Sequence, residues 1–263
     1  MKKGTVSFLI ILLCAGVNHA QSLSDIDSLI LQGKDHIQKA VDSQDVQQML
    51  AARAFFKQLV NNPTYPWLIH YYIGYADKRI VNFYLSEKNK GKAKEFVNEG
   101  IWHLEKTIEL KEDFAEGYAL LSSLIGHKIG LSPLRGITLG PKSGRMLKKA
   151  FELAPENPRV SLIAGQSAYY VPKMLGGGKE NALRQIQKAI EYFQTFKPEK
   201  PIFPTWGFEE TYTYLGLIQM DRGNFAEAKQ SFKKALEINP NFGRVKFVLM
   251  KELEEKIAKQ GIK

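Results

Sequence analysis

Apolar residues recur every three or four positions along most of the chain, which predicts a succession of amphipathic helices. Two helices are expected between Asp25 and Asn62, and Pro63 ends the second of them. A closing amphipathic helix is expected after Phe242, where apolar and charged positions alternate at the same spacing. The apolar positions behind these three expectations are Ile26, Leu29, Ile30, Ile37, Val41, Val46, Met49, Leu50, Phe56, Leu59, Val60, Val245, Val248, Leu249 and Leu253.

The most regular stretch runs from Glu209 to Phe242 and combines small and large residues at set positions. It predicts two antiparallel helices that cross closely where Gly216 faces Ala228, with a turn at residues 221–224. With Glu209 as the first position of a unit of about 34 residues, the size-restricted positions are Tyr212 at 4, Leu215 at 7, Gly216 at 8, Ala228 at 20, Phe232 at 24, Ala235 at 27 and Pro240 at 32.

Three weaker copies of this pattern precede it. The first opens at Trp67 and needs lengthened helices on either side of a polar turn at 86–91. The next opens near Ala115 and contains a segment with four glycines, 126–140, which predicts a long and functional loop. The last begins at Asn157 and carries an insertion at 171–178, and a proline-bearing connector then leads to Trp206.

These spacings resemble those of tetratricopeptide repeats. The resemblance implies an all-α fold: a right-handed α-solenoid of about five helical hairpins with a C-terminal capping helix, as one domain over residues 21–263. The sequence from Pro172 to Gly178 is similar to the Pro-x-x-x-Gly-Gly-Gly insertion of secreted bacterial repeat proteins of no assigned activity. The general organisation also resembles the repeat lipoproteins that accompany TRAP transporters.

Residues 1–20 have the pattern of a signal peptide. Two lysines precede the apolar run Val6–Ala15, which is too short for a membrane span, and small or polar residues follow up to Ala20. Cleavage after Ala20 predicts a periplasmic or secreted protein that does not span a membrane. Acylation of Cys14, the only cysteine, is the alternative, but Leu13 stands where a lipoprotein signal carries a small residue. Cleavage after Ala20 leaves no thiol for disulfides, metal ligation or nucleophilic catalysis.

The net charge of the chain and the distribution of its lysines indicate which classes of binding partner to expect. The formal net charge of +10 falls to +8 when Lys2 and Lys3 are removed, because residues 1–20 contain no acidic residue. The remaining lysines are dispersed and mostly lie beside glutamates on predicted helix faces, which is typical of solvated surfaces. No nucleic-acid-binding module is recognisable, and we expect no nucleic-acid partner.

Catalytic patterns are missing from the sequence. Its histidines after residue 20 have no neighbour at metal-ligand spacing, and no Gly-x-Ser-x-Gly elbow occurs. Glu209 and Glu210 occupy adjacent positions of one helix and point in different directions, so they cannot work as an acid and base pair. The expectation is a non-enzymatic protein without a cofactor or a metal site.

Two regions are candidates for binding. In tetratricopeptide repeats the concave groove is lined by set positions of each first helix, which fall here on Tyr71, Tyr75, Lys78 and Arg79. The resemblance therefore implies a groove for a peptide or protein partner in the cell envelope. Around the insertion, the candidates are Tyr169, Tyr170, Lys173, Gly176, Gly177 and Gly178.

The three glycines admit two interpretations. Their amides precede a predicted helix and could hold an anion, or they simply permit a tight turn against a neighbouring helix. With an anion at this position, the alternative function is an accessory or carrier protein that binds a small anionic ligand for an uptake system.

Overall fold

The computed structural model describes residues 14–259 and Gly261, with side chains described from Asp25 onward. The predicted signal peptide at 1–20 lies mostly outside this range and stays a prediction. Helices and helical turns make up the described part, which contains no strand. The helices are α1 (Cys14–Ser43), α2 (Val46–Gln58), α3 (Pro66–Ser86), α4 (Lys90–Leu110), α5 (Ala115–Leu131), α6 (Gly136–Leu153), α7 (Pro158–Tyr170), α8 (Lys179–Thr195), α9 (Phe208–Asp221), α10 (Phe225–Ile238) and α11 (Met250–Lys259).

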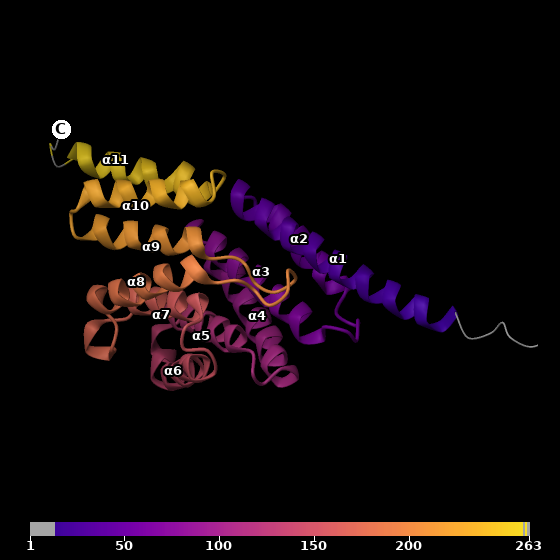
Figure 1. The fold of residues 1–263 in the computed structure, drawn as a ribbon. Coiled ribbons are helices and arrows are strands. Elements are labelled where there is room, and N and C mark those ends of the chain that lie inside the picture. The colour runs from indigo at the N-terminus through magenta and orange to yellow at the C-terminus, as the bar shows by residue number, and fades with distance from the viewer. Residues whose placement is uncertain (1–13, 260, 262–263) are drawn as a thin grey trace, which may run out of the picture.

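Consecutive helices pair as antiparallel hairpins, and the hairpins stack side by side along the chain (Figure 1). The predicted all-α solenoid is confirmed, including the lengthened helices α3 and α4. The predicted capping helix is present too, with a π-helical first part, η3 (Arg244–Leu249). Val245, Leu249 and Leu253 are buried, so this last helix covers the face that α10 would otherwise leave open.

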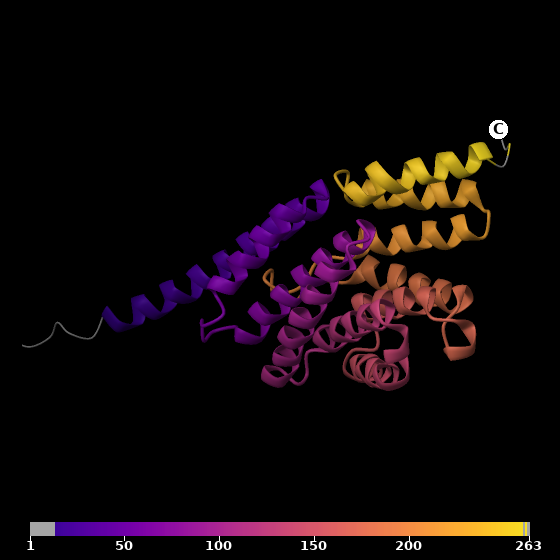
Figure 2. The ribbon, with the colours of Figure 1, turned by 180° about the vertical axis from the view of Figure 1, so that it is seen from behind.

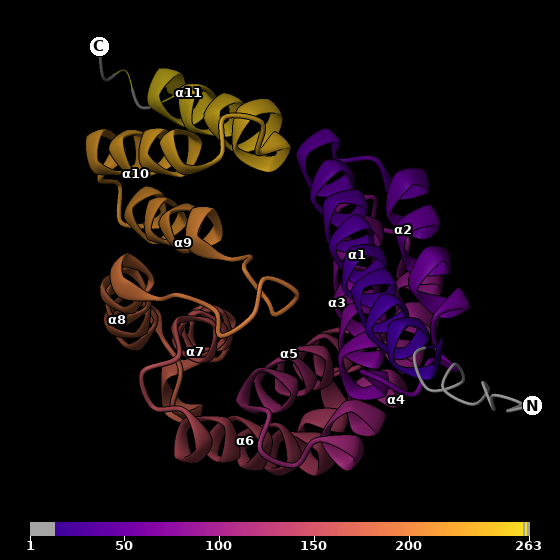
Figure 3. The same ribbon diagram turned by 45° about the vertical axis from the view of Figure 1, so that its right-hand side comes forward.

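The stack curves until its two ends meet. In Figure 3 the hairpins follow one another around a ring, and the turn after α10 reaches the turn between α1 and α2, which is also visible from behind in Figure 2. Asn239 Nδ2 donates to Asp42 Oδ1 at 2.7 Å. A Cβ atom on Gly243 would overlap the backbone oxygen of Asp42, so only glycine allows this close approach.

Each of four hairpins crosses where a glycine of its first helix lies beneath a large side chain of the second. A Cβ on Gly216 would lie 2.6 Å from Cδ1 of Phe232, so this ring packs directly on the glycine at the crossing of α9 and α10. Side chains lean along the helix and reach across the crossing, and the large residue therefore covers the glycine. The other pairs are Gly33 with Phe56, Gly74 with Leu104 and Gly165 with Ile186.

The prediction of a long loop at 126–140 is wrong. Helix α5 continues to Leu131 and α6 begins at Gly136, with only Ser132 and the short turn η1 (Pro133–Arg135) between them. A glycine inside a helix costs only about 1 kcal/mol, and Ile129 and Leu139 pack against the hydrophobic core from these segments. Apolar packing therefore outweighs the helix-breaking composition. By contrast, the insertion at 171–178 is irregular, as predicted.

Candidate functional site

The concave face of α3 is covered by the connector between α8 and α9, residues 196–207, which we call the strap. The Trp206 ring stacks on Tyr75 with centroids 4.7 Å apart and an interplanar angle of 19°. Its Nε1 donates to the Tyr71 hydroxyl at 3.1 Å. Tyr71 and Tyr75 are consequently only 0% and 3% exposed. The expectation that both tyrosines face an open groove is wrong, because the strap fills it.

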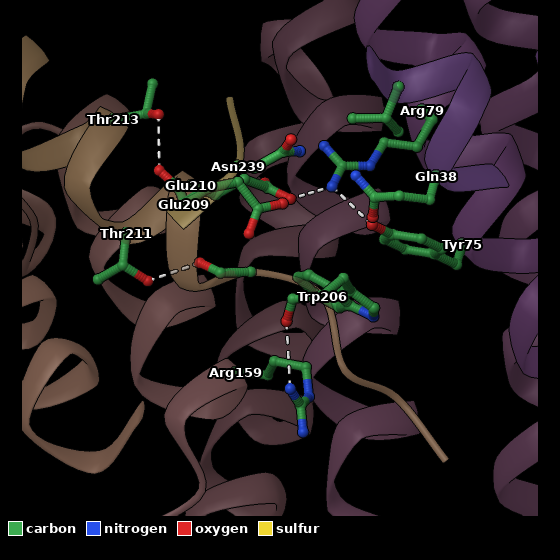
Figure 4. Close-up of polar contacts among 12 residues, drawn as sticks. Gln38, Tyr75, Arg79, Arg159, Trp206, Glu209, Glu210, Thr211, Thr213 and Asn239 are labelled. Atoms are coloured by element: carbon green, nitrogen blue, oxygen red, sulfur yellow. Dashed lines mark hydrogen bonds and ion pairs between the residues drawn. The ribbon is translucent and has the colours of Figure 1, made fainter. Parts of the chain in front are cut away.

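Other contacts hold the strap from two more elements. Lys34 of α1 donates to the backbone oxygens of Pro201 and Phe203 at 2.5 and 2.6 Å. Burial, followed by the positive charge of Arg159, lowers the pKa of Lys34 to about 8. The Arg159 guanidinium donates to the Trp206 oxygen at 3.1 Å (Figure 4). The strap is thus a packed part of the fold.

The predicted cations of the groove, Lys78 and Arg79, are also enclosed. Arg79 forms an ion pair with Glu210 of α9 and donates to the Tyr75 hydroxyl at 2.6 Å (Figure 4). Lys78 is 2% exposed, and burial lowers its pKa to about 8 against the opposing effect of Glu210. Arg79 joins α3 to α9 inside the ring and Lys78 is buried beside it, so the expectation that they lie at an accessible edge is wrong.

Glu209 is a buried carboxyl beside this ion pair. It is 6% exposed, and burial raises its pKa to about 7, with the charge of Glu210 adding to the increase. Between the ordinary pKa of 4.5 and a pH of about 7, the Glu209 carboxyl is therefore protonated in the folded protein, whereas it is ionised in the unfolded chain. The stability that this group contributes is complete below the ordinary pKa and is lost as the pH rises through about 7.

The Glu209→Gln variant is expected to lose this pH dependence. Between about pH 5 and about pH 8, the wild type should lose about 2 kcal/mol of unfolding free energy relative to the variant. Urea unfolding of both proteins at the two pH values measures this difference. Parallel pH profiles for the two proteins would contradict the buried protonated carboxyl.

The amides of the three glycines are used within their own turn. The N–H groups of Gly176, Gly177 and Gly178 donate to the oxygens of Lys173, Pro172 and Ala168 at 3.0, 3.1 and 2.8 Å. A Cβ on Gly177 would lie 2.6 Å from the carbonyl carbon of Val171. The structure thus supports the interpretation as a tight turn, since no glycine amide remains directed at an anion.

A group of aromatic residues lies beside this insertion, and we call Tyr169, Tyr170, Tyr214 and Arg244 the tyrosine cluster. The ring of Tyr170 is 4.9 Å from that of Tyr169 and 6.5 Å from that of Tyr214, both nearly perpendicular. Arg244 Cζ lies 5.7 Å from the Tyr214 ring. The cluster joins α7, α9 and η3, and burial followed by the nearby Tyr170 hydroxyl raises the pKa of Tyr214.

Part of this region is open to solvent. Tyr170 is 66% exposed and Met174 is 89% exposed, with Leu175 and Lys173 exposed next to them. The position of the insertion is fixed because Tyr169 donates to Asp221 at 2.8 Å, and Lys179 pairs with the same carboxylate at 3.1 Å. Tyr170, Met174 and Leu175 therefore expose apolar and aromatic side chains next to the exposed Lys173, while Tyr214 of the tyrosine cluster is buried.

The structure reveals one histidine pair that the sequence analysis missed. His70 and His103 lie on α3 and α4 with their Nδ1 atoms 2.8 Å apart. Burial, followed by the charge of His70, lowers the pKa of His103 to about 3. No group of three His, Cys, Asp or Glu residues that could hold a metal ion occurs in the described part of the chain. Nor does any described helix combine the length and apolarity needed to cross a membrane.

Comparison with known proteins agrees with this architecture. The model of the tetratricopeptide repeat family matches residues 209–242. The chain is a TPR-like α-solenoid. Its fold is similar to that of the HusA haemophore from Porphyromonas gingivalis, with a TM-score of 0.61 and 24% identity over 76% of this chain and 93% of HusA.

A second similar structure is TTC0263, a thermophilic TPR protein from Thermus thermophilus. The TM-score is 0.55 and the identity 16%, over 86% of this solenoid and 99% of TTC0263. No curated protein matches the chain. The similarity of the Pro172–Gly178 insertion to secreted repeat proteins, and the likeness to TRAP-associated lipoproteins, stay predictions.

Proposed function

We propose that this solenoid is a non-catalytic binding protein of the bacterial cell envelope and that it binds a flat, largely apolar ligand carrying a carboxylate at the tyrosine cluster. The envelope location rests on the predicted signal peptide at 1–20. The ligand class rests on one observation, the exposed ring of Tyr170, which lies close to Arg244 and is followed four residues later by the exposed Met174. An extended peptide along α3 is less well supported, because the strap already occupies that wall.

The chemistry of the surface suits an amphipathic ligand. Aromatic rings and a methionine offer broad apolar contact with little loss of side-chain freedom. Arg244 and the exposed Lys173 can each pair with a carboxylate, Arg244 in a bidentate manner. Porphyrins combine a flat apolar ring with carboxylates, and the similar HusA is described as a haemophore. This proposal is a specific form of the small anionic ligand considered from the sequence.

Protoporphyrin IX and haemin are the probes that test this proposal. We expect the Tyr170→Ala/Met174→Ser variant to bind both about tenfold more weakly than the wild type, which corresponds to about 1.4 kcal/mol. Absorbance titration measures haemin binding, and tryptophan fluorescence quenching measures both ligands. Loss of haemin binding alone would indicate that Tyr170 or Met174 acts on the iron.

Leu134→Ser/Ile137→Ser is the matched control, since it removes two exposed apolar side chains from another part of the surface. It should bind both probes as the wild type does. Equal affinity of wild type and Tyr170→Ala/Met174→Ser would exclude the tyrosine cluster as the ligand site.

A further inference from the structure

Two aliphatic side chains are exposed where η1 leads into α6, the helix labelled at the lower edge of the ribbon in Figure 1. Leu134 is 86% exposed and Ile137 is 82% exposed, so nearly the whole of each side chain meets solvent. They are three residues apart in consecutive helical turns, which places them on the same side. We call this pair the aliphatic tip.

The charged residues in the segment around the aliphatic tip are all Lys or Arg. From Gly117 to Phe151 it contains no Asp or Glu, while the overall composition has 27 acidic residues among 263. Several cations from this segment are exposed or half-buried on the surface. They are Lys128, Arg135, Lys142, Arg145, Lys148 and Lys149.

Arg135 adjoins Leu134 in the sequence, and the salt bridge of Lys142 with Glu105 links α6 to α4, which also carries Lys94. Burial lowers the pKa of Lys128, and the positive charges of Arg135, Lys142 and Lys94 lower it further. Residues of α4, α5, η1 and α6 therefore contribute to one positive surface. Glu105 opposes this effect and pairs with Lys142 at 2.6 Å. One carboxylate does not neutralise four cations, so the surface stays positive.

We propose that the aliphatic tip and these cations dock the protein on the surface of a lipid bilayer that contains anionic lipid. A convex pair of aliphatic side chains can enter the boundary between headgroups and acyl chains, while the surrounding lysines and arginines pair with phosphates. The proposal uses residues remote in sequence from the tyrosine cluster and does not depend on the ligand proposed there.

Other partners fit this surface less well. Residues 126–149 contain no Phe, Tyr or Trp on which the bases of a nucleic acid could stack. Hot spots of protein interfaces are enriched in Trp, Tyr and Arg, and Leu is under-represented among them, whereas the aliphatic tip consists of Leu134 and Ile137. A bilayer requires no complementary pocket, and the two short aliphatic chains match the depth of its interface.

Co-sedimentation with vesicles tests this docking directly. The full chain should bind vesicles of phosphatidylcholine with about 30% phosphatidylglycerol, and binding to phosphatidylcholine alone should be at least about tenfold weaker. The Leu134→Ser/Ile137→Ser variant should lose at least about tenfold in partitioning to the anionic vesicles. Raising the salt concentration from about 0.1 M to about 0.5 M should also weaken binding severalfold.

Two controls separate docking at this site from general attraction of a basic protein. Lys94→Glu/Arg135→Glu should abolish binding to anionic vesicles, while Lys246→Glu/Lys251→Glu, with the same change in net charge at exposed lysines of η3 and α11, should reduce it only slightly. Met174→Ser/Leu175→Ser should bind vesicles like the wild type. Equal losses in both charge variants, or unchanged binding of Leu134→Ser/Ile137→Ser, would overturn the proposal.

Discussion

Replacing Arg159 by methionine is expected to lower the free energy of unfolding by about 3 to 5 kcal/mol. Arg159 is 0% exposed, and its Nε donates to Glu116 at 2.7 Å. The substitution leaves the buried carboxylate of Glu116 without its cation, and the strap loses the hydrogen bond to the Trp206 oxygen. Urea unfolding followed by circular dichroism measures the loss.

The Arg159→Met/Glu116→Gln double variant shows whether the lower stability comes from the unpaired charge of Glu116 or from the lost packing of the Arg159 side chain. The glutamine side chain would be neutral and could still accept a hydrogen bond from Asn157, whose Nδ2 lies 3.1 Å from Glu116 Oε1 in the wild type. Most of the lost stability should therefore return. If the double variant is no more stable than the single one, the loss comes instead from the packing of the guanidinium, whose Cζ lies 4.4 Å from the Phe196 ring centroid.

Replacing Gly216 by leucine should destabilise the protein by about 3 kcal/mol, because the helix crossing between α9 and α10 has no room for a side chain. Even an ideal Cβ would lie 2.6 Å from Cδ1 of Phe232, which is fully buried. The ring cannot move without separating the two helices. Thermal and urea unfolding measure the effect, and Gly216→Ala should show a smaller loss of the same sign.

Gly144→Ala is the control for helix propensity. Gly144 lies inside α6, and a Cβ there would meet no atom within 4 Å. Alanine should therefore stabilise this helix by up to about 1 kcal/mol. A similar gain in Gly216→Ala would show that the crossing is not tightly packed.

The hairpins could be predicted from the sequence because each depends on local patterns. Helical spacing of apolar residues, a glycine under a large side chain and a turn are all encoded within one repeat. The exception at 126–140 has a physical cause, since the contacts of Ile129 and Leu139 with other helices outweigh the local cost of glycine. The prolines did indicate a connector leading to Trp206, but not that it would cross the concave wall.

The candidate site was much less predictable. Tyr71 and Tyr75 occupy the repeat positions that line a groove, but their accessibility depends on a connector more than a hundred residues later in the chain. Arg79 and Glu210, which form an ion pair, are likewise more than a hundred residues apart along the chain. Exposure of Tyr170 was not predictable either, although its position beside the insertion identified the region.

The sequence by itself determined the class of fold, the positions of the hairpins and the register of the repeat at 209–242, because these follow from interactions between residues close along the chain. The tertiary structure alone decided that the strap fills the groove, that Lys78 and Glu209 are enclosed, and that Leu134 and Ile137 protrude among cations. Those features depend on the curvature of the whole stack, which sums small rotations between successive hairpins and brings the turn after α10 against the end of α1.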